Sequence, residues 1–352
     1  MGWLCCPDCH QPLSERSAQV CCSDCGQSWR VRHGIADFTD SARRAEDEEF
    51  GTYARALPEL VRIARHDGWL EALEKVICPL PEVGPGMFSY VTDESKGDLI
   101  HVTNIGRGHK VLDLGCGLGA VSVAIAQRGA DCHVVDVSHE QTIFTAIRCR
   151  QLGCAGVKAA CAGDDMKLPL ADGYLDAIVM NGVLEWLGCA ERYRGSPEDS
   201  QLAMLREAHR VLRPGGELYV ASKNLYSLLH FLGTAPDHGT RLPWIGILPP
   251  QLQRLLTVGR VPDSGARIYG LRAYRRLFRT AGFVEIAAYA LMPEFRHPKR
   301  FIPLSAPAPV AFRGPDSSDI YNRRLERLLA RLLPCEVLRR LVYCYGFLLE
   351  KK

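Results

Sequence analysis

The chain has 352 residues, of which 47% are hydrophobic, and a formal net charge of +3 at pH 7. This length can hold one large and one small domain or two mid-sized domains, each with a substantial core. The mild charge and the lack of a basic block argue against nucleic acid as the obvious partner. The sequence shows no apolar leader region and no apolar stretch of about 20 residues, so we expect a soluble cytoplasmic protein without a transmembrane segment.

The fifteen cysteines are unevenly placed, because six of them fall within the first 25 residues. In a cytoplasmic protein this concentration predicts metal ligands or reduced thiols in place of disulfides. Two Cys-x-x-Cys pairs separated by 12 residues can present four thiolates from two tight turns, which makes a closed tetrahedral site for structural Zn²⁺. A redox pair is the alternative, and the missing βαβ context disfavours it. The predicted ligands are Cys6, Cys9, Cys22 and Cys25.

We expect residues 1–40 to fold as a small domain that the metal stabilises, since about 40 residues bury too little core to fold alone. Cys5 and Cys21 are neighbouring thiols that do not keep the two-residue spacing in both turns. The segments CPDCHQPL and CSDCGQSWRVRHGIADF resemble the zinc ribbons of the Trm112-like type. In that type the second pair leads to an aromatic residue and a Gly-Ile-x-x-Phe ending. Those places are filled here by Trp29, Gly34, Ile35 and Phe38.

Residues 41–105 are expected to form a linker and N-terminal helices. Residues 41–58 are charged and end near Pro58, which is typical of a linker with at most an entry helix. Apolar residues at helical spacing predict a helix over 59–77, with a loop around 81–86 and a further helix over 94–105.

Residues 110–136, KVLDLGCGLGAVSVAIAQRGADCHVVD, have the pattern of strand, glycine turn, helix and second strand. Three alternating glycines follow Asp113, and Asp136 ends the second strand. A carboxylate about 20 residues after such a turn can bind both ribose hydroxyls of a nucleotide. The alternating glycines and the preceding acid differ from the dinucleotide pattern G-x-G-x-x-G, and this difference favours S-adenosylmethionine (SAM) over NAD. A glycine turn in a cofactor-free α/β fold is the alternative.

The stretch resembles motif I of class I SAM-dependent methyltransferases. The resemblance implies an α/β fold with a Rossmann-like, seven-stranded sheet over residues 106–352, accompanied by the small N-terminal zinc ribbon and by inserted cap segments. In this family the first acid lies near the amino acid end of SAM and the second acid holds the ribose. Tyr90 lies where the N-terminal segment of such enzymes often closes over the cofactor, although a core aromatic is an equally good interpretation.

Beyond Asp136, the pattern predicts a helix over 138–151 with Ser138 as N-cap, and a short strand over 157–161. In the methyltransferase family, an acid four residues before a Leu-Pro pair accepts a hydrogen bond from the adenine amino group. Here that position is Asp164, and Asp165 would offer its backbone N–H. Alternatively, these acids merely end the strand.

A fourth strand is expected over 176–181, and strand ends on this side of a parallel sheet line the ligand crevice. Asn181 and Gly182 would face the methionine end of SAM. Glu185 would act as a base or orient the acceptor. Alternatively, it is a glutamate at a helix start, where its negative charge interacts favourably with the helix dipole. The predicted cofactor-binding residues are Asp113, Gly115, Cys116, Gly117, Gly119, Asp136, Val137, Asp164, Asp165, Asn181 and Gly182.

The C-terminal part departs from a minimal methyltransferase. We expect a helix over 200–212, a structural Leu-Arg-Pro-Gly-Gly turn and a strand over 217–222, then a helix over 271–281 and strands over 283–291 and 342–350. The long insertions 223–270 and 292–341 predict a cap over the substrate. The arginines of the predicted helix 325–341 would contact anionic lipid at a peripheral membrane site or an acidic partner, or else form a solvated helix face.

Three short blocks, within 146–150, 223–238 and 267–295, resemble methyltransferases of bacterial surface-glycan pathways. That subgroup commonly has Glu-Asn followed by Glu-Asp-His-Thr-Gly; here Lys223 replaces the first Glu, and the Asp-His pair is kept as Asp237-His238. The resemblance implies a small-molecule or glycan acceptor. A hydroxyl acceptor must lose a proton, so His238 is the candidate base and Asp237 its orienter. The alternative is a histidine that caps its loop.

Two other functions stay open. One is an RNA methyltransferase whose zinc ribbon binds RNA, against which stand the mild charge and the absence of an Asn-Pro-Pro-Tyr or Pro-Cys motif. The other is a regulatory protein that binds SAM without catalysis. The sequence leaves the acceptor and the oligomeric state open.

Overall fold

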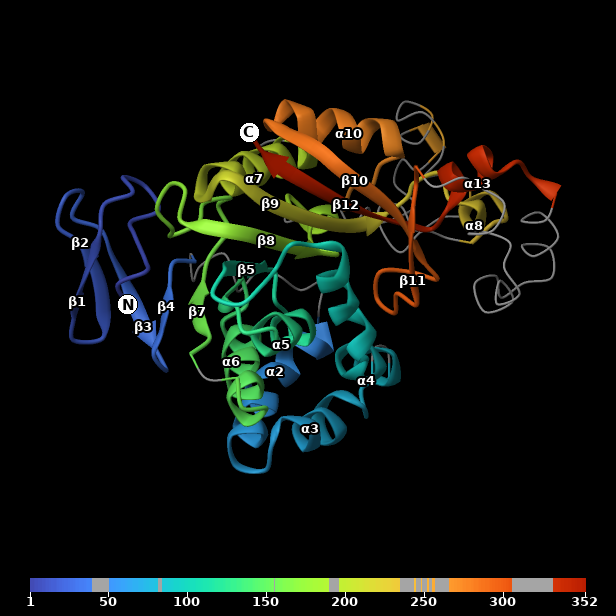
Figure 1. Ribbon diagram of the computed structural model, residues 1–352. Coiled ribbons are helices and arrows are strands. Elements are labelled where there is room, and N and C mark those ends of the chain that lie inside the picture. Colours follow the sequence, from blue (N-terminus) through green and yellow to red (C-terminus); the bar gives the residue numbers. More distant parts are fainter. Residues whose placement is uncertain are drawn as a thin grey trace. The chain divides into compact units, whose positions relative to one another are not determined.

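The computed structural model describes residues 1–39, 51–81, 84–154, 156–189, 196–234, 266–305 and 332–352, and five isolated positions within 235–265. These residues divide into two compact units. Their helices and strands are labelled in Figure 1. The first unit contains Met1–Met180, Met204–Leu218 and Lys351–Lys352, and the second contains Asn181–Ala203 and Tyr219–Glu350. Of the predicted cap segments, most of 235–265 and all of 306–331 lie outside the described residues.

The N-terminal ribbon, residues 1–39, is an antiparallel meander of four short strands. Its last strand then pairs in parallel with β7 of the same unit, with Ala36 opposite Ala160 and Asp37 opposite Cys161. The ribbon therefore extends the main sheet of the first unit, which the sequence did not predict. The strands are β1 (Leu13–Arg16), β2 (Gln19–Cys22), β3 (Ser28–Arg32), β4 (Ile35–Asp37) and β7 (Lys158–Cys161).

The main sheet of the first unit continues from the ribbon in the order β4-β7-β6-β5-β8-β9, and its central strands run parallel. These strands are almost continuously buried, as expected for a parallel sheet covered by helices on both faces. The architecture confirms the predicted α/β class, and β7 and β8 lie within one residue of their predicted bounds. The elements are β5 (Lys110–Leu114), α5 (Ala120–Gln127), β6 (Asp131–Asp136), α6 (His139–Gln151) and β8 (Leu175–Asn181).

The N-terminal helices differ from the prediction in three places. The helix predicted over 94–105 is a 3₁₀ helix that ends at Val102. The predicted helix over 59–77 begins earlier, at Gly51, contains Pro58, and ends at His66 because Gly68 has a φ of 111°. The expected loop around 81–86 is instead the start of a helix with a proline in its first turn, a position that proline tolerates. The elements are α2 (Gly51–His66), α3 (Trp69–Ala72), the π-helical turn η2 (Leu73–Ile77), α4 (Gly84–Thr92) and the 3₁₀ helix η3 (Glu94–Val102).

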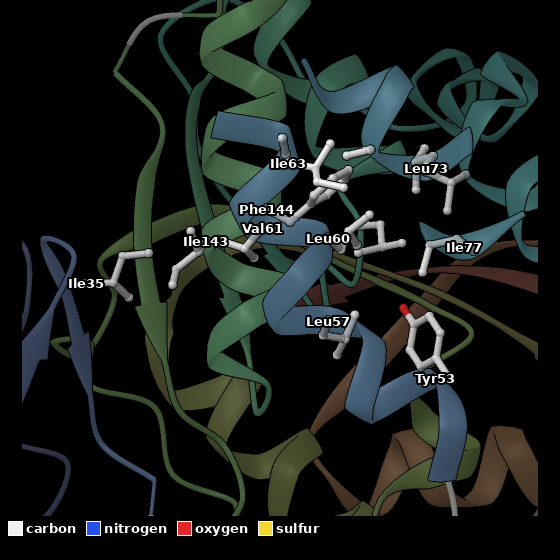
Figure 2. Packing of buried hydrophobic residues seen from close by; sticks show 14 residues of the cluster. Ile35, Tyr53, Leu57, Leu60, Val61, Ile63, Leu73, Ile77, Ile143 and Phe144 are labelled. Carbon is white, nitrogen blue, oxygen red and sulfur yellow. The ribbon is translucent and has the colours of Figure 1, made fainter. Parts of the chain in front are cut away.

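Helix α2 continues through Pro58 because the burial of its apolar face stabilises it by more than the one backbone hydrogen bond that proline cannot donate. Its apolar face, which includes Leu57 and Leu60, packs with Ile143 and Phe144 of α6 in one buried cluster (Figure 2). Ile35 of the ribbon belongs to the same cluster and is only 5% exposed. Burying one such side chain contributes roughly 2–3 kcal/mol, so the ribbon shares a core with the helices.

The second unit is a smaller sheet in the order β9-β12-β10-β11. Strand β9 passes through both units and begins at Leu212, so the expected Leu-Arg-Pro-Gly-Gly turn is the first part of a strand. Strand β11 was not predicted; it pairs antiparallel with β10, with Ala290 opposite Ile302. The elements are α7 (Pro197–Val211), which spans both units, β9 (Leu212–Lys223), α8 (Leu228–Phe231), α10 (Leu271–Thr280), β10 (Phe283–Met292), β11 (Arg300–Pro303), α13 (Cys335–Leu341) and β12 (Cys344–Lys351).

Among the described residues, no helix combines the length and the apolar character that crossing a bilayer requires. Of the predicted helix 325–341, the described part is Leu332 and α13.

Candidate functional site

The glycine turn after β5 needs glycine for conformational reasons. Gly115, Gly117 and Gly119 have φ values of 76°, 50° and 80°, in the left-handed region that residues with a Cβ rarely adopt. The amide of Gly115 donates to the carbonyl of Val135 at 2.7 Å, which attaches the turn to β6. The Thr145 hydroxyl donates to the Gly117 carbonyl at 2.8 Å. The turn is therefore held from both sides, and its Gly115 and Gly117 are partly exposed.

Asp136, at the end of β6, connects this turn to the next loop. One carboxylate oxygen accepts from the amide of Gly117 and the other from the amide of Ser138, both at 2.9 Å. Burial raises the pKa of Asp136, and the two amides oppose that effect. The carboxylate is thus fixed at the carboxyl edge of the sheet, where its remaining lone pairs can accept from a diol.

Asp113 is buried at 2% exposure and lies one residue before the end of β5. The hydroxyl of Ser122, in α5, donates to its Oδ2 at 2.5 Å. Burial is the main cause that raises the pKa of Asp113 to about 7, and the nearby Asp136 raises it further. Such a carboxyl is suited to a cationic ligand group, because an adjacent positive charge would restore the ionised form.

The loops after β6 and β7 lie next to each other. The amide of Ala162 donates to the Asp136 carbonyl at 3.1 Å, and the Cys161 thiol donates to the Val137 carbonyl at 3.3 Å. The Val137 side chain is 46% exposed, whereas Asp164 is buried at 5%. This arrangement offers an apolar surface beside an acid, as a purine base would require.

The first unit therefore brings most of the predicted cofactor residues to the carboxyl ends of three adjacent strands, β5, β6 and β7. Ser138 caps α6 as predicted, because its hydroxyl accepts from the amide of Gln141 at 3.3 Å. The residues gathered there are Asp113, Gly115, Cys116, Gly117, Gly119, Asp136, Val137, Asp164 and Asp165.

Two further side chains reach this region from elsewhere in the first unit, and sequence reasoning missed both. The Tyr53 hydroxyl accepts from Gln141 Nε2 at 3.1 Å, and burial together with Asp136 raises the Tyr53 pKa. Arg148 is buried and donates to the Leu118 carbonyl in the glycine turn at 2.8 Å and to the Val91 carbonyl at 3.1 Å. The helical spacing of Tyr53 with the apolar face of α2 was the available signal for it.

In the second unit, Asn181 is the last residue of β8 and Gly182 follows it directly. Gly182 has a φ of 72°, and its amide donates to the Ala221 carbonyl at 2.9 Å. A Cβ at this position would overlap the ring of Phe295, which is buried at 4% exposure. Phe295 therefore lies against the predicted ligand edge of this unit. Its block, Met292-Pro293-Glu294-Phe295, was recognised in the sequence without a role.

Glu185 lies in the short helix η4 (Leu184–Trp186) and is fully buried. The Ser222 hydroxyl donates to its Oε2 at 2.8 Å and lies 2.8 Å from the Tyr274 hydroxyl, which donates to the Lys223 carbonyl at 2.9 Å. Burial raises the pKa of Glu185, while the charges of Lys223 and Arg296 oppose that effect. Glu185 is thus part of an internal polar network. The other catalytic candidates, Asp237 and His238, lie outside the described residues.

The four predicted metal ligands in the ribbon form a compact thiol cluster. Their sulfur atoms all lie within 4.8 Å of one another, with Cys6 to Cys25 at 3.5 Å and Cys9 to Cys22 at 3.4 Å. A tetrahedral zinc site with Zn–S bonds of about 2.3 Å places its sulfurs about 3.8 Å apart, so these distances fit such a site. Cys5 is not in the cluster; its amide donates to the Pro169 carbonyl at 3.0 Å.

Comparison with known proteins identifies the family. Residues 112–220 match a family described as a methyltransferase domain. Methyltransferase GfsG of Streptomyces halstedii is 30% identical over 212 residues, which are 58% of this chain and 69% of GfsG. A ubiquinone biosynthesis O-methyltransferase of Pseudomonas aeruginosa (strain UCBPP-PA14) is 28% identical over 151 residues, which are 43% of this chain and 56% of that protein.

Among solved structures, the cyclase SpnF has 16% identity and a TM-score of 0.48, covering 85% of this chain and 94% of SpnF. The α/β architecture, the matched domain and the extent of the match to GfsG lead to one conclusion. The chain belongs to the family of SAM-dependent methyltransferases.

Proposed function

We propose that this protein transfers the methyl group of SAM to a hydroxyl of a small-molecule or glycan acceptor. The observation that carries the proposal is the position of Asp113 and Asp136 at the ends of the adjacent strands β5 and β6, on either side of the glycine turn. The name of the Pseudomonas relative, an O-methyltransferase, supports oxygen as the acceptor atom. The strand orders β7-β6-β5-β8-β9 in the first unit and β9-β12-β10 in the second support a seven-stranded methyltransferase sheet.

In this proposal, different residues of the first unit bind different parts of the cofactor. Asp136 accepts from the ribose hydroxyls, because both of its oxygens are already oriented by backbone amides. Val137 packs against the adenine ring, and Asp164 accepts from the adenine amino group. Asp113 binds near the amino acid end, and Asn181 and Gly182 remain the residues predicted for the methionine end. When bound, SAM supplies a sulfonium methyl group that an acceptor oxygen can displace in line.

The acceptor oxygen must lose its proton as it attacks the methyl carbon. We assign this proton to the imidazole of His238, oriented by Asp237. The carbon–sulfur bond breaks, its electron pair remains on sulfur, and S-adenosylhomocysteine leaves as the neutral thioether. General-base assistance of this kind contributes typically 10²- to 10⁴-fold. Glu185 is the second candidate base, supported by its buried position and its raised pKa.

In the same proposal, the thiols of Cys6, Cys9, Cys22 and Cys25 bind one structural Zn²⁺. Four protein ligands leave no open coordination position, so the metal holds the ribbon together and takes no part in methyl transfer. The cytoplasm is the proposed location, because reducing conditions there keep the four thiols available.

A SAM-consumption assay tests the function. The purified chain would be incubated with SAM and, separately, with nucleotide sugars, lipid-linked glycans and RNA fractions, and formation of S-adenosylhomocysteine would be measured. We expect turnover with a sugar or small-molecule hydroxyl acceptor and an oxygen-linked methyl group in the product. Methylation of RNA alone would overturn the choice of acceptor. Tight SAM binding without turnover on any fraction would favour the regulatory alternative.

A further inference from the structure

Lys96, in the 3₁₀ helix η3, is a cation buried at 1% exposure in the first unit. Burying an ammonium is costly unless its charge is balanced or used. Among the described residues of this unit, Arg148 is the other buried arginine or lysine, and its guanidinium donates to two backbone carbonyls and stacks over Trp69. Lys96 needs a separate explanation, because η3, which carries it, packs on α5, the helix that directly follows the glycine turn.

The position of Lys96 follows from the packing of η3 on α5. A Cβ on Gly97 would come within 2.7 Å of the Ala124 side chain, so glycine allows the two helices this close approach. Helix α5 starts directly after the glycine turn and carries Ser122, the hydrogen-bond donor to Asp113. The Lys96 ammonium donates to the Tyr90 carbonyl and lies over the Tyr90 ring. Its charge acts on the Asp113 carboxyl and lowers the pKa of that group against the effect of burial.

The charges in this part of the first unit match one end of SAM. Asp113 and Asp136 are two buried carboxyl groups, and Lys96 is one buried ammonium. The methionine part of SAM carries an α-ammonium, an α-carboxylate and a sulfonium. Because Asp136 is assigned to the ribose, Asp113 is the acid that remains for the α-ammonium, and Lys96 is the cation available for the α-carboxylate. An ammonium has three N–H donors, so donation to the Tyr90 carbonyl is compatible with donation to a ligand as well.

We propose that Lys96 binds the α-carboxylate of SAM, while Asp113 receives the α-ammonium on the other side of the same carbon atom. The assignment rests on the proposed SAM site and adds a cofactor-binding residue to it. It also gives Tyr90 a role, because the Tyr90 ring and carbonyl hold the ammonium in place. No sequence motif indicates Lys96, since it lies upstream of β5, where the recognisable pattern begins.

Isothermal titration of the full chain with SAM and with decarboxylated SAM, which lacks only the carboxylate, tests the proposal without any acceptor. Lys96→Met should weaken SAM binding roughly 10- to 100-fold, the size of a charge-assisted hydrogen bond, and should change the affinity for decarboxylated SAM by less than about threefold. Lys96→Arg, which keeps the charge, should bind SAM within about tenfold of the wild type. The matched control is Lys110→Met, because Lys110 also lies over a tyrosine ring, that of Tyr174, but at the start of β5.

Equal losses for the two ligands in Lys96→Met would show a structural role and overturn the proposal, and so would an unchanged affinity for SAM. If Lys96→Met does not fold, the wild type itself decides: equal affinity for SAM and decarboxylated SAM means that no group recognises the carboxylate. Failure of the wild type to bind either ligand would instead overturn the SAM site on which the proposal rests.

Discussion

Ala36 of the N-terminal ribbon pairs in parallel register with Ala160 of β7, so a strand that precedes the whole methyltransferase domain is part of its sheet. Next to this pair, the amide of Phe38 donates to the Cys161 carbonyl at 2.8 Å. The Cys161 thiol in turn donates to the carbonyl of Val137 at the candidate adenine surface. The folding of the ribbon and the shape of the cofactor region are therefore connected through one strand.

Loss of one metal ligand should unfold the ribbon and destabilise the first unit. We expect Cys9→Ser to lose bound zinc, measured by metal analysis, and to lower the melting temperature and the solubility. The matched control is Cys21→Ser, because Cys21 lies in the same ribbon but outside the thiol cluster. Undiminished zinc in Cys9→Ser would refute the site.

The contact between ribbon and helices can be tested without touching the metal. Ile35→Ala should lower the free energy of unfolding by about 2–4 kcal/mol, because it removes a buried side chain from the cluster with Leu60 and Phe144. Ile286→Ala is the control, since Ile286 is 50% exposed and should cost less than about 0.5 kcal/mol. Both variants should keep zinc. Denaturant titration measures the difference, and equal effects of the two changes would contradict the shared core.

The buried carboxyl of Asp113 predicts a pH dependence in the ligand-free protein. Its pKa is about 7 in the folded state, above the ordinary value of about 3.9 in the unfolded chain. The folded state then binds the proton more tightly than the unfolded chain does. Protonation of Asp113 therefore contributes to the free energy of unfolding in full below about pH 4, and this contribution is lost as pH rises through 7. Asp113→Asn cannot ionise, so the variant should not lose this stability at high pH. It should stabilise the ligand-free protein at pH 8 by roughly 2–4 kcal/mol and should weaken SAM binding.

Denaturant titrations from pH 5 to pH 8 measure this effect as the difference between Asp113→Asn and the wild type. The difference should grow with pH. Asp67→Asn is the control, because the Asp67 side chain is 44% exposed. A difference that stays constant over this range would show that Asp113 is not protonated when the site is empty.

The two candidate bases differ in what their replacement should do. His238→Ala should reduce turnover by about 10²- to 10⁴-fold and leave SAM affinity within a few fold, because the imidazole acts on the acceptor proton. Glu185→Gln keeps the shape of the side chain and an acceptor for the Ser222 hydroxyl, so turnover should stay within about tenfold. Single-turnover rates and SAM titrations separate these effects. Equal losses of turnover and SAM affinity in His238→Ala would remove the histidine from catalysis.

Features that depend on near neighbours along the chain could be predicted from the amino-acid sequence. The positive φ angles of Gly115, Gly117 and Gly119 and the N-cap at Ser138 follow from local backbone sterics and local hydrogen bonds. The choice of Cys6 and Cys22 over their neighbouring cysteines follows from a two-residue spacing, and the thiol cluster has that composition. The α/β class follows from apolar runs that alternate with helical patterns.

Features that depend on contacts between distant segments became visible only in the folded chain. Pro58 lies inside α2 although local rules place proline at a helix start, because the buried cluster with α6 favours the helix. The pairing of Ala36 with Ala160 joins segments more than a hundred residues apart. The burial of Lys96 depends on how η3 packs against α5. Burial and long-range pairing are properties of the assembled core, so no local pattern could have revealed them.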